Sequence, residues 1–212
     1  MKIIKSLEQL LYELMVWIVF YPLTLWRATI RPLSLMDYAD EELDDDDEDR
    51  YSDTLSPPIF LAISLGLIHL IELAAQVNLM ENGLLADDRN LIAFRLVAFA
   101  LFPLMLSIRY LRARGIALDR KTLREPFYAQ CFVAAPYAIG IDGATVLIGV
   151  TESLLPALIL LGVSVGWYLT VQTVWFSRAL GVSKPRGLVH ALRAYLASVV
   201  VLLVLSSVID RL

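Results

Sequence analysis

The sequence predicts an all-α membrane protein, a polytopic helical bundle of five spans preceded by an amino-terminal interfacial or partly embedded helix. Of its 212 residues, 58 % are hydrophobic, and mean hydropathy is +0.66, whereas soluble domains are about 45–50 % apolar. Five apolar stretches are long enough to cross a hydrocarbon core of about 30 Å. Lys and Arg gather in alternate connections between these stretches. The expected spans are 58–80, 91–110, 126–148, 154–177 and 188–208.

Residues 1–35 are predicted to form the amino-terminal amphipathic helix. Their apolar run, 14–26, is too short to span and is interrupted by Pro22. It ends in aromatic and cationic residues that favour a membrane interface. We therefore expect an interfacial or partly embedded helix that is broken at Pro22, and the alternative is a full crossing.

Residues 36–57 are predicted to be a disordered acidic linker. The stretch from Asp37 to Asp53 reads DYADEELDDDDEDRYSD, and such dense negative charge repels itself and buries little apolar surface. A calcium site is the sharper hypothesis, but the glycine and terminal glutamate of an EF-hand loop are absent. We favour a solvated segment that attracts basic partners and ends at Ser56-Pro57-Pro58.

The bundle is expected to occupy residues 58–212, and its first span carries three polar residues, His69, Glu72 and Gln76. Their spacing of three and four places them on one helical face. Because a charge at the membrane centre costs roughly 2.5–3.5 kcal/mol on insertion scales, this face should turn toward protein or trapped water. A proton or ion relay, a substrate contact, or a packing network between helices would each use such a face.

The second span carries Arg95 about one turn inside its start. Glu72 lies about two turns before the end of the first span. If the two spans are antiparallel neighbours, Arg95 and Glu72 reach similar depth and can pair, as membrane charges commonly do.

The connection between the second and third spans is the most basic segment. It is too short and too close to the membrane to indicate nucleic-acid binding. We interpret it as an orientation signal that also contacts anionic lipid headgroups. Its six cations are Arg109, Arg112, Arg114, Arg120, Lys121 and Arg124.

The third and fourth spans contain helix-packing signals. Pro136 should kink the third span. Asp142 lies near its outer end, where we expect it at the interface, with contact to the Glu72 region as the alternative. Gly162 and Gly166 form a G-x-x-x-G pattern that lets another helix approach closely. We expect that contact within the bundle rather than in a dimer.

The distribution of cations predicts the orientation. With the amino terminus inside, five Lys and Arg precede the first span, six lie in the Arg109–Arg124 loop, and four surround Arg178–Arg193, against three on the opposite side. The positive-inside rule then predicts a cytoplasmic amino terminus and an outside carboxyl terminus. We expect an integral protein of a bacterial inner membrane.

Chemistry-bearing motifs are absent from the sequence. The single cysteine, Cys131, excludes an internal disulfide and a multi-cysteine metal site, and the two histidines, His69 and His190, form no metal motif. No G-x-S-x-G, H-E-x-x-H or paired catalytic aspartates occur. We therefore expect no catalytic residues, no metal and no cofactor, and hence a protein that is not an enzyme.

The five closely spaced spans follow a polar linker, and the third opens with FYAQCFVAAP from Phe127 to Pro136. Over residues 58–208 this plan resembles the Yip family, five-span membrane proteins named for interaction with Rab GTPases, whose bacterial members are often labelled permease-like. The resemblance implies a non-enzymatic scaffold, adaptor or membrane organiser, with the bilayer and another membrane or cytoplasmic protein as partners, or a homo-oligomer. The alternative is a small transporter or channel built on the polar residues His69, Glu72 and Arg95.

Overall fold

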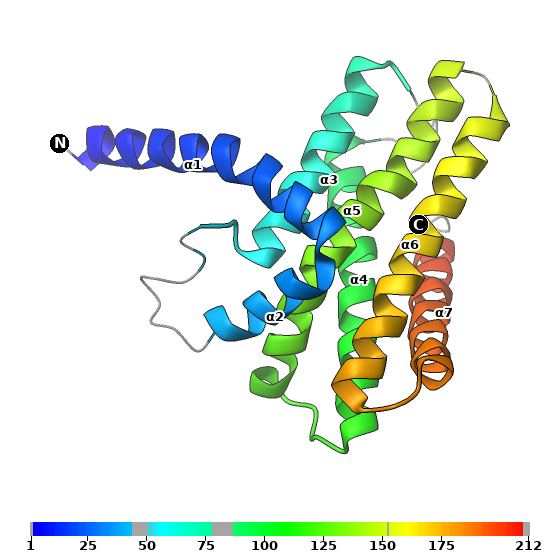
Figure 1. Ribbon diagram of the computed structural model, residues 1–212. Helices are drawn as coiled ribbons and strands as arrows, with labels where there is room; N and C mark the ends of the chain where they lie inside the picture. Colours follow the sequence, from blue (N-terminus) through cyan, green and yellow to red (C-terminus); the bar gives the residue numbers. More distant parts are fainter. Residues whose placement is uncertain (1, 44–50, 52, 78–86, 152, 210–212) are drawn as a thin grey trace.

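The computed structural model describes residues 2–43, 51, 53–77, 87–151 and 153–209, and these residues form helices and turns without any strand. Five helices are long and apolar enough to cross a membrane, which confirms the predicted all-α class and the number of spans. They lie side by side as a bundle (Figure 1). The five are α3 (Pro57–Ala74), α4 (Asp88–Arg114), α5 (Arg120–Thr151), α6 (Leu154–Leu180) and α7 (Lys184–Ile209).

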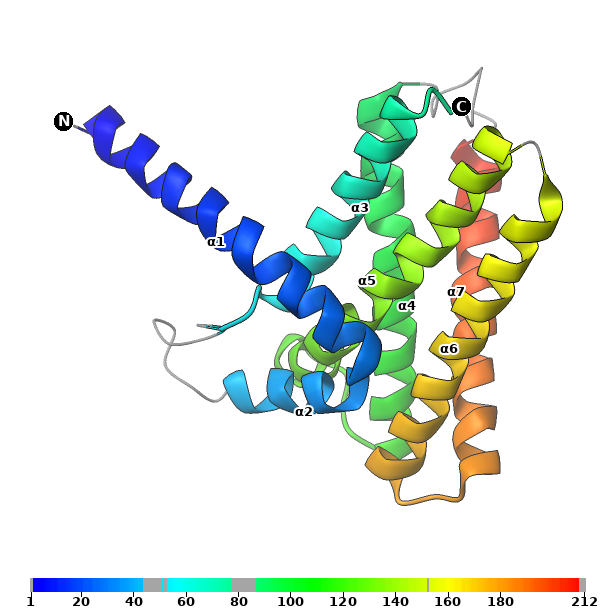
Figure 2. The ribbon, with the colours of Figure 1, turned by 45° about the horizontal axis from the view of Figure 1, so that its top comes forward.

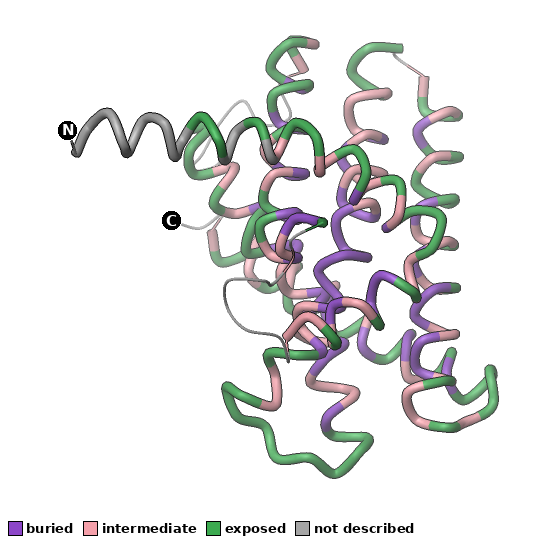
Figure 3. Tube along the Cα trace, turned by 60° about the vertical axis from the view of Figure 1, so that its left-hand side comes forward, coloured by how far each residue is buried: buried purple, intermediate pink, exposed green. Residues whose placement is uncertain are grey.

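Helix α5 is the centre of the bundle. It contacts α3, α4 and α6 as well as the two amino-terminal helices. Its buried face is rich in alanines, which lets neighbouring helices approach closely and pack by van der Waals contact. The buried residues accordingly concentrate in the middle of the structure (Figure 3). The fully buried alanines of α5 are Ala129, Ala134, Ala135 and Ala138.

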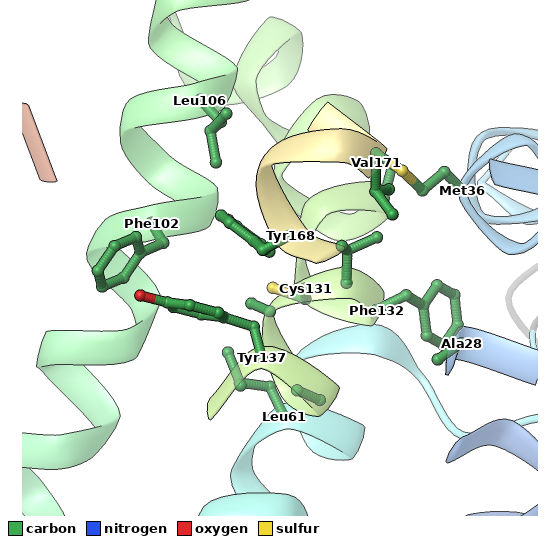
Figure 4. Close-up of a cluster of buried hydrophobic side chains, with 14 of the residues drawn as sticks. Ala28, Met36, Leu61, Phe102, Leu106, Cys131, Phe132, Tyr137, Tyr168 and Val171 are labelled. Atoms are coloured by element: carbon green, nitrogen blue, oxygen red, sulfur yellow. The ribbon is translucent and has the colours of Figure 1, made fainter. Parts of the chain in front are cut away.

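An aromatic cluster joins four of the spans, and Phe102, Tyr137 and Tyr168 from three of them lie near Cys131 (Figure 4). Tyr137 of α5 stacks on Tyr168 of α6 with ring centroids 4.3 Å apart, and Phe102 of α4 meets Tyr137 edge-on at 5.2 Å. The hydroxyl of Tyr137 lies 3.0 Å from that of Tyr195 on α7. Aromatic pairs of this kind add about 0.5–1.5 kcal/mol each beyond simple burial.

Local sequence signals set several helix ends. The carboxylate of Asp87 accepts the backbone N–H of Arg89 at 2.9 Å and caps α4. Gly115 (φ 68°) and Gly181 (φ 64°) take left-handed conformations just after α4 and α6. Gln76 takes the same conformation (φ 56°) after α3, although it has a side chain. The helix of the span predicted as 58–80 therefore ends at Ala74, and residues 78–80 of that prediction lie outside the described residues.

The amino-terminal segment differs from its prediction in where it breaks. Helix α1 (Lys2–Ile30) continues through Pro22. A proline inside a helix removes one backbone hydrogen bond, and this loss does not end the helix here. The break comes instead at Arg31, before Pro32 opens the next helix. Helix α1 is not among the helices long and apolar enough to span, and its amino-terminal half projects away from the bundle (Figures 1 and 2).

The predicted disordered linker is wrong for its first part. Residues 37–42 belong to helix α2 (Pro32–Glu42), which packs on α5. Leu35, Met36 and Ala39 are buried there, so apolar burial outweighs the repulsion among the acidic side chains. Residues 44–50 and 52 of the predicted linker lie outside the described residues.

Candidate functional site

Four ionisable side chains from three helices meet inside the bundle, and we refer to them as the ionic cluster. They are His69 and Glu72 of α3, Arg95 of α4 and Asp142 of α5, with exposed fractions of 3, 3, 6 and 7 %. Helical spacing places His69 and Glu72 on the inner face of α3. Because α3 and α4 contact each other and α5 contacts both, all four side chains reach a common position.

Arg95 lies within 4.0 Å of each of the other three members of the ionic cluster. Its Nη2 donates to Oε1 of Glu72 at 2.9 Å, and its Nη1 donates to Oε2, so the guanidinium holds both carboxylate oxygens. The similar depths of Glu72 and Arg95 on consecutive spans predict this pair from the sequence. Bidentate pairs of this kind are both stronger and more directional than single hydrogen bonds. The pair therefore ties the carboxyl-terminal end of α3 to the amino-terminal part of α4.

Asp142 and His69 complete the ionic cluster. Oδ2 of Asp142 lies 4.0 Å from Nε of Arg95, so Asp142 faces the cluster, and the expectation of an interfacial position is wrong. Nδ1 of His69 lies 3.4 Å from Nη1 of Arg95. The same Nδ1 lies 3.7 Å from Oε2 of Glu72, and Nε2 of the ring lies 4.0 Å from Oδ1 of Asp88.

The charges of the ionic cluster do not fully balance. One guanidinium, that of Arg95, faces the two carboxyl groups of Glu72 and Asp142. Among the described residues, two buried polar atoms of the cluster, Nε2 of His69 and Oδ2 of Asp142, have no hydrogen-bond partner. In the described part of the chain, no group of three or more His, Cys, Asp or Glu is arranged to hold a metal ion.

Gln76 does not join the ionic cluster. Because α3 ends at Ala74 and Gln76 adopts a left-handed conformation, its exposed side chain leaves the face that carries His69 and Glu72. The amide of Val77 bonds to the carbonyl of Glu72 at 3.1 Å, a pattern typical of helix ends. Gln76 therefore terminates the helix, a role usually taken by glycine or asparagine.

The predicted helix contact at Gly162 and Gly166 is wrong within the bundle. Both glycines are exposed, and a Cβ added at either would meet no atom within 4 Å. Close approaches to α6 lie instead at Gly140 of α5, where an added Cβ would come within 2.8 Å of the Cβ of Ser164, and at Gly187 of α7, where it would come within 2.5 Å of the carbonyl oxygen of Thr173. A G-x-x-x-G pattern indicates a face that permits contact, but it does not show which neighbour uses it.

The basic connection lies at one end of the bundle, which we call the basic end and which also carries the α6–α7 turn (Figure 1). Nε of Arg109 donates to Nδ1 of His190 on α7 at 3.1 Å. Nη1 of Arg114 donates to the carbonyl of Ala179 on α6 at 3.0 Å. These two arginines hold neighbouring helices together. The other four cations are exposed: Arg112, Arg120, Lys121 and Arg124.

A second buried polar pair was not predicted from the sequence. The side-chain amides of Gln130 on α5 and Gln172 on α6 exchange hydrogen bonds of 3.0 and 2.6 Å, and both residues are fully buried. A single amide inside each apolar run is the signal that could have indicated them. Such interhelical bonds contribute roughly 0.6–2 kcal/mol in membranes.

Comparisons of the chain with protein-family models, with curated proteins and with solved structures found no match.

Proposed function

We propose that this protein is a non-enzymatic integral membrane scaffold, in which a bundle locked by internal charges displays an apolar helix to a partner. The observation that carries the proposal is the exposure of α1. Among the side chains of α1 that the structure describes, Met15, Ile18 and Trp26 are 65, 73 and 66 % exposed. Large apolar side chains gathered in this way are typical of surfaces that bind protein or membrane.

The carboxyl-terminal part of α1 anchors this helix to the bundle. The hydroxyl of Tyr21 donates to Oγ of Ser64 on α3 at 3.1 Å. The carbonyl of Thr29 accepts a bond of 3.3 Å from the indole of Trp167 on α6. Ala28 is fully buried beside them. Helix α1 is therefore fixed at one end and displayed at the other, which suits an adaptor whose partner is another membrane or cytoplasmic protein, or a second copy of this chain.

The ionic cluster supports the same proposal. The guanidinium of Arg95 is engaged by both oxygens of Glu72, and three cavities in the described part of the chain, of about 730, 320 and 310 Å³, are lined by residues outside the cluster. Charges that pair with one another fix the positions of α3, α4 and α5. In this proposal the cluster holds the bundle rigid and takes no direct part in transport.

The orientation is part of the proposal. The α4–α5 and α6–α7 connections, which carry most of the cations, lie together at the basic end (Figure 1). The positive-inside rule then favours a cytoplasmic basic end and a cytoplasmic amino terminus, in a bacterial inner membrane. Membership of the Yip family stays a prediction from the sequence.

Site-specific photo-cross-linking in native membranes tests the scaffold proposal. A photoreactive residue at Ile18 of α1 should give protein adducts of defined mass. The matched control is the same residue at Val200, which is 58 % exposed on α7; we expect lipid adducts there. Lipid adducts alone from both positions would contradict the proposal.

A small proton-coupled transporter is the second candidate function. It is favoured by the excess carboxylate of the ionic cluster and by Asp88, which is exposed at the start of α4 and whose Oδ1 lies 4.0 Å from Nε2 of His69. Ionisable groups at membrane depth commonly mark proton paths. In proteoliposomes this candidate requires proton flux that Asp142→Asn and His69→Ala abolish; absence of flux would remove it.

A further inference from the structure

The basic end carries an apolar groove that the proposed function does not use. The groove has a volume of about 730 Å³ and lies between α4 and the first turns of α5. Figures 1 and 2 both show these first turns standing apart from α4. Its α4 wall consists of Val97, Ala100, Leu101 and Leu104. Since both helices are candidate spans, these side chains lie in a stretch suited to the hydrocarbon of a membrane.

The other wall changes from apolar to cationic along α5. Leu123, Phe127 and Tyr128 continue the apolar lining, and Arg120 and Arg124 complete it. The guanidinium of Arg124 lies over the ring of Tyr128, 5.4 Å from its centroid. Within the described part of the chain, neither arginine has a carboxylate partner. The groove thus combines an apolar trough with two guanidinium groups available to an anion.

The nearest carboxylate of the loop does not neutralise these arginines by direct contact. Oδ1 of Asp119 accepts the backbone N–H groups of Lys121 and Thr122, both at 2.8 Å, and so caps the start of α5. The bond from the backbone of Thr122 has the largest effect, and together with the bond from Lys121 it holds the pKa of Asp119 below its ordinary value, although desolvation acts in the opposite direction. The carboxylate of Asp119 therefore binds the start of α5 rather than Arg120 or Arg124.

From this arrangement we infer that the groove binds one anionic phospholipid of the leaflet at the basic end. An acyl chain lies along the α4 wall, and the headgroup phosphate lies between Arg120 and Arg124. Guanidinium groups bind phosphate oxygens through paired N–H donors. Basic pockets between membrane helices commonly bind anionic headgroups. The apolar lining favours a ligand that has an acyl chain as well as a phosphate, because a site for a free anion would not need an apolar wall.

Native mass spectrometry of the full-length protein in detergent tests the inference, with phosphatidylglycerol and phosphatidylcholine of identical chains as probes. We expect phosphatidylglycerol to be retained in preference to phosphatidylcholine. Replacing two cations near a membrane surface, in R120Q/R124Q, should weaken phosphatidylglycerol binding about thirtyfold. The matched control R186Q/R193Q removes the same charge from exposed positions of α7 and should change binding little.

Two further measurements distinguish a bound phospholipid from other bound anions. Ala100→Phe fills the apolar trough without changing the charge, and it should also reduce phosphatidylglycerol binding. Excess inorganic phosphate should leave the bound lipid in place. The inference fails if Ala100→Phe binds normally, if phosphate displaces the lipid, or if the two double variants behave alike. A thermal unfolding midpoint near that of wild type shows that a variant is folded.

Discussion

At the scale of single residues, Arg95 determines how the ionic cluster acts. A buried charge is tolerable when it is paired, and removing one partner leaves the others uncompensated. Glu72 and Asp142 both depend on this one guanidinium, and both are almost fully buried. The cluster should therefore respond far more to the loss of one member than to the loss of all its charges.

Arg95→Met should destabilise the protein by about 3–5 kcal/mol, because it strands two buried carboxylates. The triple variant E72M/R95M/D142N removes every charge that Arg95 balances, and it should recover most of that loss. The free energy of unfolding, measured by titration with sodium dodecyl sulfate in mixed micelles, distinguishes the two variants. Arg112→Met, at an exposed position of α4, is the control and should change stability by less than about 0.5 kcal/mol. A triple variant as unstable as the single one would contradict the pairing account.

At the scale of helices, Gly140 and Gly162 show why a motif does not identify a contact. Both are glycines inside apolar helices, and only Gly162 belongs to the G-x-x-x-G pattern. Yet α6 approaches α5 at Gly140, opposite Ser164. Hydropathy predicts that a helix spans, since spanning depends on composition, but the neighbour that each face meets depends on how all five helices pack.

Gly140→Ala should destabilise the protein by about 1–3 kcal/mol, because the added methyl group overlaps the Cβ of Ser164. Gly162→Ala is the matched control, since open space surrounds that position. Alanine is the better helix former by up to about 1 kcal/mol, so the control should be neutral or stabilising. The same unfolding titration measures both variants. Equal effects at the two positions would show that α5 and α6 do not meet at Gly140.

Asp53 fastens the end of the predicted linker to helices α1 and α2. Its Oδ2 accepts from Nη1 of Arg27 at 2.9 Å, and its Oδ1 accepts from the hydroxyl of Tyr38 at 2.6 Å. Burial alone would raise the pKa of Asp53, but the bonds from Tyr38 and Arg27 outweigh it, and the pKa falls below its ordinary value of 3.8. The contribution of Asp53 to stability is therefore present above that pH and is lost as the pH falls through the lowered value.

Asp53→Asn should cost at most about 1 kcal/mol near neutral pH, because the ion pair is largely exposed. Free energies of unfolding of the two proteins should converge as the pH falls below 3.8, where Asp53 becomes protonated in the unfolded and then in the folded state. Titrations at a series of pH values test this. A difference that is unchanged at the lowest pH would mean that the carboxylate charge is not what fastens the segment.

At the scale of the whole molecule, the sequence predicted the architecture better than the site. The number of spans followed from hydropathy, because each apolar stretch is long enough to span on its own. The pairing of Glu72 with Arg95 was predicted because the two residues lie at similar membrane depth on consecutive spans. Asp142 was assigned to the interface because sequence position does not say which way a long central helix faces. Residues 37–42 were assigned to a linker because the burial of Leu35 and Met36 against α5 is a tertiary effect.

In the proposed scaffold, the buried ionic cluster and the exposed helix α1 have separate roles. The ionic cluster holds the bundle together, and α1 is displayed to a partner. If this division is correct, the cluster can lose its charges without loss of partner contact, provided that the fold is kept. A transporter would show the reverse, because its activity would depend on those charges and its amino-terminal helix would be dispensable.

Photo-cross-linking from Ile18 in the background of E72M/R95M/D142N tests this division most directly. The variant is compared with wild type in native membranes at matched expression and matched stability. We predict the same defined protein adducts, in similar yield, from both proteins. Loss of the adducts from a folded triple variant, or a wild type that gives lipid adducts alone, would contradict the scaffold account.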